Sequence, residues 1–194
     1  MAEIKSTMEM VLERAARMEK EAGGPVAIDY SRDGMRIGAA YMNGSTPDMM
    51  ATLMEEAQEK RESLRQGILQ VLLRNVILPR DDEQQEGSNK ALQGLIDISG
   101  GHEEIASLCA ELQQILGQYN QHKEQMTEQL EEALKGQLQQ QQSMQGAQVE
   151  AHELSAAAHP QYNAELSKML GELNDQYLQA MDQRKEVIKQ AFDL

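Results

Sequence analysis

The chain has 194 residues, a formal net charge of −14 and only 3% aromatic residues. Clustered Lys and Arg are what bind phosphate backbones and anionic lipids, so the acidic balance disfavours nucleic acids and membrane surfaces as partners. No apolar run approaches the roughly 18 residues that span a bilayer. The single cysteine, Cys109, cannot form an internal disulfide. These features favour a cytoplasmic location.

Thirteen Met residues, together with many Leu and Ala, replace the aromatic rings that usually fill a core. These residues are good helix formers, and Met adapts to irregular surfaces. The expected fold class is therefore all-α. The pattern described below predicts an elongated helical bundle with a long, coiled-coil-like antiparallel hairpin.

The N-terminal part, residues 1–98, is expected to contain helices at about 6–21, 47–78 and 89–98. Ser6 and Glu9 form a capping box for the first. The run Thr46-Pro47-Asp48 is a typical helix start for the second. The polar run 80–88 is interpreted as a linker before the third.

Residues 26–44 fit two structures. They could form a β-hairpin around 31–34, or a short helix that begins at Ser31 and ends at Gly44. The helix is favoured because an isolated hairpin is marginal in water and the sequence has no other strand signal. In the helix, Met35, Ala39 and Met42 would share one face.

Apolar residues in 47–78 recur at steps of three and four, which predicts one long heptad seam. Polar Arg61 and Asn75 fall on it and could fix register or partner choice. A continuous exposed apolar strip is unusual in a soluble monomer, so the seam is a candidate partner surface. The alternative is that the first helix and residues 91–98 cover it. The candidate seam residues are Met50, Met54, Leu64, Ile68, Val71 and Leu78.

The C-terminal part, residues 102–194, is predicted to be a long helical hairpin. One helix should run from His102 to about Met144, some 65 Å, and a second should begin near Tyr162. The turn should lie near residues 146–158. The Gln-rich segment 137–148 leaves open whether the helical tip is ordered. Both helices carry apolar stripes, expected to meet antiparallel. On the second helix the stripe includes Tyr177, Arg184 and Val187.

The N-terminal run EIKSTMEMVLERAARM, from Glu3 to Met18, resembles the signature of a family of uncharacterised small helical bacterial proteins. In that family the segment corresponding to MRIGAAYMNG is also helical, which supports a helix in 26–44. The resemblance implies a bacterial cytoplasmic protein and brings no activity, cofactor or binding residue.

The sequence has no recognisable catalytic or cofactor motif. None of the four histidines follows a Glu at the spacing of a di-iron helical site, and no glycine-rich phosphate loop occurs. Cys109 lies on an apolar helical stripe and is interpreted as a small core residue. We therefore expect no enzyme activity, no cofactor, no metal and no small-molecule ligand.

Two functional hypotheses remain. The first is a helical protein–protein interaction protein, such as a scaffold, adaptor or assembly subunit, which binds a protein partner or self-associates. The second is a small acidic binding chaperone, whose Met-rich faces could repack around a basic client during export or assembly.

Overall fold

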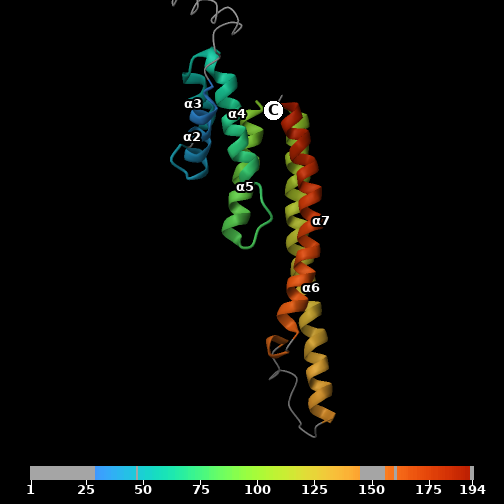
Figure 1. Cartoon of the computed structure of the whole chain (residues 1–194). Helices are drawn as coiled ribbons and strands as arrows, with labels where there is room; N and C mark the ends of the chain where they lie inside the picture. The colour runs from blue at the N-terminus through green and yellow to red at the C-terminus, as the bar shows by residue number, and fades with distance from the viewer. Residues whose placement is uncertain (1–28, 47, 145–155, 160, 193–194) are drawn as a thin grey trace, which may run out of the picture. The chain divides into compact units, whose positions relative to one another are not determined.

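Every regular element in the described residues is helical, so the predicted all-α class is confirmed. The structure, a computed structural model, describes residues 29–46, 48–144, 156–159 and 161–192. The chain divides into two units, Met1–Tyr30 and Ser31–Leu194, and the described helices all belong to the second. The helix expected at about 6–21 lies outside the described residues. The elements are α2 (Ser31–Met42), α3 (Met49–Glu55), α4 (Gln58–Asn75), α5 (Asp82–Ile98), α6 (Glu103–Met144), the 3₁₀ turn η2 (Ala156–Ala158) and α7 (Tyr162–Ala191) (Figure 1).

Residues 31–42 form the helix α2, which was the favoured alternative for this region. The helix ends at Met42, and Gly44 follows it with a φ of +77°, a left-handed conformation that glycine adopts without strain. Its buried face differs from the expected one: Gly34, Gly38 and Tyr41 are buried, whereas Ala39 is exposed.

Glycines explain why α2 packs through that face. A β-carbon at Gly34 would lie 2.0 Å from the carbonyl oxygen of Leu64, and one at Gly67 would lie 1.9 Å from the carbonyl oxygen of Ser31. A β-carbon at Gly38 would lie 3.1 Å from Val71 Cβ. Backbones can approach this closely only where side chains are absent. The helices α2 and α4 therefore cross in backbone contact.

The single helix predicted at 47–78 is wrong, because the chain breaks after Glu55. Asp48, rather than Thr46, caps α3 by accepting a 2.8 Å hydrogen bond from the Ala51 N–H. Glu56 is extended, and Arg61 then donates to the carbonyls of Met54 (2.6 Å) and Glu56 (2.9 Å). Arg61 thus satisfies carbonyl groups that the broken helix leaves open.

The helix predicted at 89–98 begins seven residues earlier, so the expected linker at 80–88 is wrong. Asp81 caps α5 through a 2.9 Å hydrogen bond from the Gln84 N–H, and acidic residues occupy its first turn. Both features stabilise a helix start. Ser88, 0% exposed, bonds to the backbone at residues 75 and 77 and fixes the segment between α4 and α5.

The helix predicted from His102 to about Met144 is present as α6, preceded by Gly100 and Gly101 at positive φ. Its 42 residues correspond to about 63 Å. The partner helix α7 begins at Tyr162, as expected. Most of the predicted turn at 146–158 lies outside the described residues.

Candidate partner-binding surface

The six predicted seam residues do not form one surface, because α3 and α4 are separate helices. Leu64 and Ile68, 2% and 0% exposed, are buried where α2 crosses α4. Met54 is 54% exposed. Met50, Val71 and Leu78 are half-buried. The crossing of α2 and α4 covers the middle of the predicted seam. Met54 lies on the separate short helix α3 and stays exposed.

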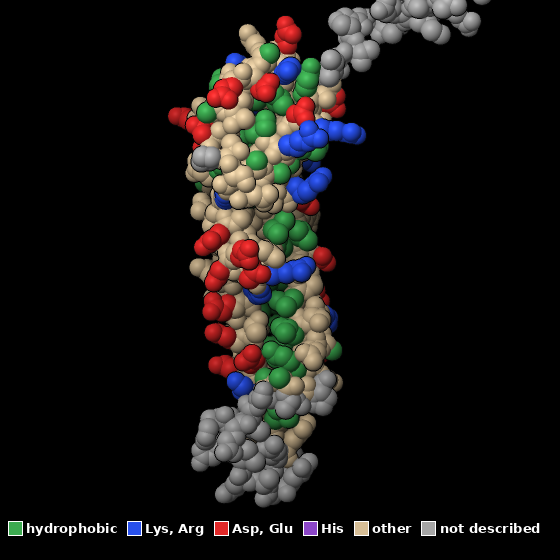
Figure 2. Space-filling model, turned by 90° about the vertical axis from the view of Figure 1, so that its left-hand side faces the viewer, with side chains coloured by type: hydrophobic (Ala, Val, Ile, Leu, Met, Phe, Trp, Pro, Cys, Tyr) green, Lys and Arg blue, Asp and Glu red, His purple; other side chains and the backbone are tan. Residues whose placement is uncertain are grey.

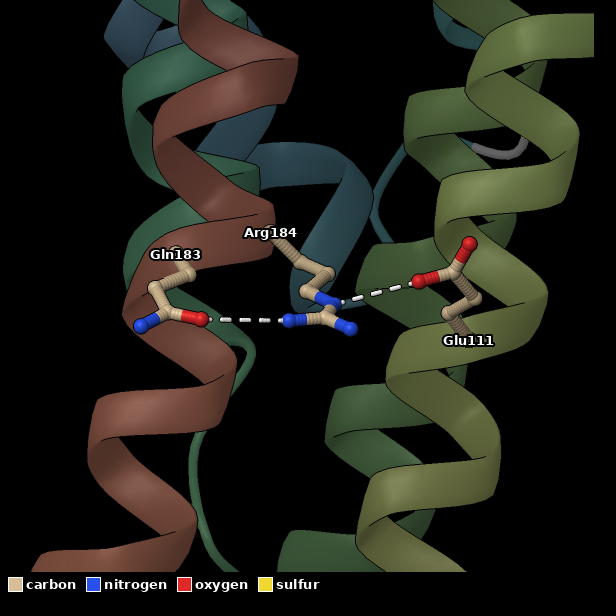
Figure 3. A network of polar contacts seen from close by, with 3 residues as sticks. All are labelled: Glu111, Gln183 and Arg184. Carbon is tan, nitrogen blue, oxygen red and sulfur yellow. Dashed lines mark hydrogen bonds and ion pairs between the residues drawn. The ribbon is translucent and has the colours of Figure 1, made fainter.

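The helices α6 and α7 run antiparallel, because residues late in α7 meet residues early in α6. Arg184 Nε donates to Glu111 Oε2 at 3.1 Å while its Nη1 reaches Gln183 (Figure 3). Further contacts lie towards the other end of the pair. They are the Tyr119 hydroxyl to Asn174 Oδ1 at 2.9 Å, the Tyr177 hydroxyl to His122 Nδ1 at 2.6 Å, and the Tyr162 hydroxyl to Glu131 at 3.4 Å.

Over part of its length this pair is covered by α4 and α5 (Figure 1). Lys185 Nζ donates to the Val76 carbonyl at 2.5 Å, and burial lowers the pKa of this lysine. Met181 and Ile188, one helical turn on either side of Lys185, are 0% exposed. The covered side of α7 is therefore the one that carries 181, 185 and 188.

The cover on α6 ends near Lys123. Asn120 donates to Gln85 of α5 at 2.9 Å, and Lys123 donates to the Arg80 carbonyl at 3.2 Å. Beyond this point α6 continues for about 30 Å. Figure 1 shows α6 and α7 extending past the N-terminal end of α5.

The side of the pair that α4 and α5 cover continues past Lys123 as an apolar surface, which we call the open face. Helical spacing carries the covered side of α7 from Met181 back to Leu178 and Leu170, and Leu166, which packs on Leu130 and Leu134 of α6, borders it. Leu178 is 42% exposed, and Leu166 and Leu170 are half-buried. On α6 the same spacing leads to half-buried Leu138. Figure 2 shows a column of hydrophobic side chains on the lower part of the view.

One edge of the open face is acidic. A groove of about 430 Å³ lies under the start of α5. Its lining includes Glu124, Glu128 and Glu131 of α6, which follow one another at steps of four and three, and Asp81 and Asp82. We call the three glutamates the acidic row. In Figure 2 acidic side chains line one edge of the hydrophobic column.

The base of the open face is held by a small core around η2. Leu130, Leu134 and Ala156 are buried there, and Tyr162, Leu166 and Met169 pack against them. Leu166 and Met169 are half-buried, so the same side chains that build this core contribute apolar surface outside it.

The single cysteine, Cys109, is a structural residue. Cys109 is 1% exposed, and burial raises the pKa of its thiol to about 11, which confirms its interpretation as a core residue. Within the described ranges no group of three His, Cys, Asp or Glu side chains could hold a metal ion. No helix there is long and apolar enough to cross a membrane.

Sequence reasoning missed the open face because it placed the stripe of α7 along Tyr177, Arg184 and Val187. The structure buries Met181 and Ile188 and leaves Val187 42% exposed. The signal was present in the sequence: Leu170, Met181 and Ile188 add apolar positions beside the seam through Leu166 and Tyr177 that contacts α6.

The described residues form an all-α protein in which the antiparallel pair of α6 and α7 is partly covered by α4 and α5. The chain belongs to a family of unknown function (DUF6657), whose model matches residues 50–190. No curated protein and no solved structure matches the chain.

Proposed function

We propose that this protein is a helical protein-interaction module, a scaffold, adaptor or assembly subunit, whose open face binds a helix of a protein partner. One observation carries the proposal. The side of α6 and α7 that α4 and α5 cover continues beyond Lys123 with half-buried Leu166 and Leu170, exposed Leu178 comes before them in this direction on α7, and half-buried Leu138 follows on α6.

A docked helix matches the chemistry of this surface. Between Lys123, where the cover ends, and Glu131, which faces the start of α7 at Tyr162, the two helices run together for about 12 Å, so a docked helix would lie on both of them over about two turns. An amphipathic helix recognises such a surface through apolar residues at steps of three and four. Each half-buried leucine covered would contribute about 25 cal/mol per Å² of apolar area removed from water.

Two single substitutions on opposite sides of α7 test the proposal. Leu170→Glu places a charge on the open face, and Gln179→Glu makes the same charge change on the other side, nine residues away in the helix. Both positions are incompletely buried, so both variants should keep their helical content. The tagged wild type, L170E and Q179E are purified from the source organism, and bound proteins are compared by mass spectrometry.

The proposal expects a partner that is retained by wild type and Q179E and lost by L170E. A partner retained equally by all three would place the binding surface elsewhere. Gel filtration then separates the two kinds of role. A scaffold or assembly subunit should stay in a stable complex, whereas a binding chaperone should release its client and suppress its aggregation.

A further inference from the structure

We infer that the partner helix is amphipathic and carries Lys or Arg along the edge that lies over α6. This inference rests on the proposed function and specifies the chemistry of the partner. It follows from the acidic row, which places three carboxylates on the α6 edge of the open face, whereas the α7 edge carries exposed Ser167 and Gly171 and a single carboxylate, Asp175.

The carboxylates of this edge outnumber the cations beside them, because the groove is lined by five carboxylates and by only two basic residues, Arg80 and Lys123. In the part of the chain that the structure describes, Glu124, Glu128 and Asp82 form no ion pair, and Glu131 pairs only with Lys135, at 3.7 Å. Lys123, the nearest lysine on α6, is directed to the Arg80 carbonyl. Carboxylates spaced four and three apart form a row along one side of a helix. Such a row complements basic residues at the same spacing on a neighbouring helix.

Charge complementarity also decides between a different protein and a second copy of this chain. In a twofold dimer each open face would meet its own copy. Two acidic rows would then be brought into one interface between chains that each carry −14, which is unfavourable. The segment 6–21 of this chain has no excess of basic residues either, with Arg14, Arg17 and Lys20 against four glutamates. A basic helix from another protein is the occupant that fits.

The inference is tested with two synthetic helical peptides of about 20 residues. Both carry leucines at steps of three and four. One carries Lys along a single edge, and the other carries Glu at the same positions. Binding of labelled peptide to the full chain is followed by fluorescence anisotropy at low and at moderate salt. The Lys peptide should bind, and added salt should weaken it, because exposed charges are screened beyond about 10 Å at 0.1 M. The Glu peptide should not bind.

Matched charge variants assign the effect to the acidic row. The double variant E124Q/E128Q should weaken the Lys peptide about 3- to 10-fold, as expected for two exposed charge pairs. The control E165Q/E172Q removes two carboxylates from the side of α7 opposite the open face and should change the affinity less than about 2-fold. L170E should abolish binding. Circular dichroism checks that each variant retains its helices.

Several results would overturn the inference. These are binding of neither peptide, equal binding of both, or equal weakening by E124Q/E128Q and E165Q/E172Q. The outcomes also separate this inference from the proposed function. If both peptides bind equally and L170E abolishes both, the interaction surface stands and only its preference for a basic helix is wrong. If the Lys peptide binds L170E as well as wild type, the open face is not the binding surface and both proposals fail.

Discussion

A β-carbon on Gly34 would lie 2.0 Å from the carbonyl oxygen of Leu64, a separation that real β-carbons essentially never show. The neighbour is backbone, so it cannot move aside as the end of a flexible side chain could. Gly34 is therefore required for α2 to lie against α4, and this contact covers Leu64 and Ile68.

We expect Gly34→Ala to lower the free energy of unfolding by about 1–3 kcal/mol, the usual cost of overpacking. Gly117 is the matched control, because a β-carbon there meets nothing within 4 Å. Gly117→Ala, in the interior of α6, should raise stability by about 0.5–1 kcal/mol. Urea unfolding of both variants measures the difference. Equal effects of the two substitutions would show that the crossing is not close-packed.

A second prediction concerns the phase of the α7 stripe. Ile188 is 0% exposed and Val187 is 42% exposed. Ile188→Ala should cost about 2–4 kcal/mol through lost burial and a cavity. Val187→Ala should change stability by less than about 0.5 kcal/mol, as expected for a surface position. Thermal or urea unfolding tests both. The reverse order would restore the seam through 187 that the sequence predicts.

The ion pair between Arg184 and Glu111 should contribute little to stability. It bridges α6 and α7 at 3.1 Å, but both side chains are more than a third exposed. Solvent-exposed pairs contribute about 0.2–1 kcal/mol. A double-mutant cycle with R184A and E111A should give a coupling energy in that range. A coupling above about 2 kcal/mol would show that this pair, rather than apolar burial, holds the two helices together.

Cys109 gives a prediction about alkaline pH. Burial raises the pKa of its thiol from 9.0 to about 11. Below pH 9 the thiol is neutral in both folded and unfolded chains. Between pH 9 and 11 it ionises only in the unfolded chain, so stability falls as pH rises. From pH 8 to 10 the wild type should lose about 1 kcal/mol more than Cys109→Ala. Parallel losses in the two proteins would mean that the thiol is not shielded.

The sequence predicts the helical class and the two long C-terminal helices well, because their periodic stripes are long and bounded by glycine and proline. It fails where short polar segments determine where a helix begins or breaks. The run 80–88 was interpreted as a linker although Asp81 and the acids after it form a helix start. The break at Glu56 has no glycine or proline to mark it, and Arg61 stabilises it through tertiary geometry.

The candidate surface could be predicted only in part. Periodicity locates apolar stripes, but it does not show which part of a stripe another element covers. Leu64 and Ile68 have the pattern of a partner seam and are buried by α2 through glycines that carry no hydrophobic signal. Leu170 belongs to the same stripe as Met181, and only the position where α5 begins leaves Leu170 beyond the cover.

Site-specific photo-crosslinking tests most directly whether the open face binds a partner. A photoreactive phenylalanine derivative replaces Leu170 in one variant and Gln179 in another, and both are illuminated in cells of the source organism. We predict a discrete crosslinked protein from position 170, absent from position 179, with the crosslink mapped to a helical segment of the partner. Equal crosslinking at both positions, or none at 170 while a partner still co-purifies, would contradict the account.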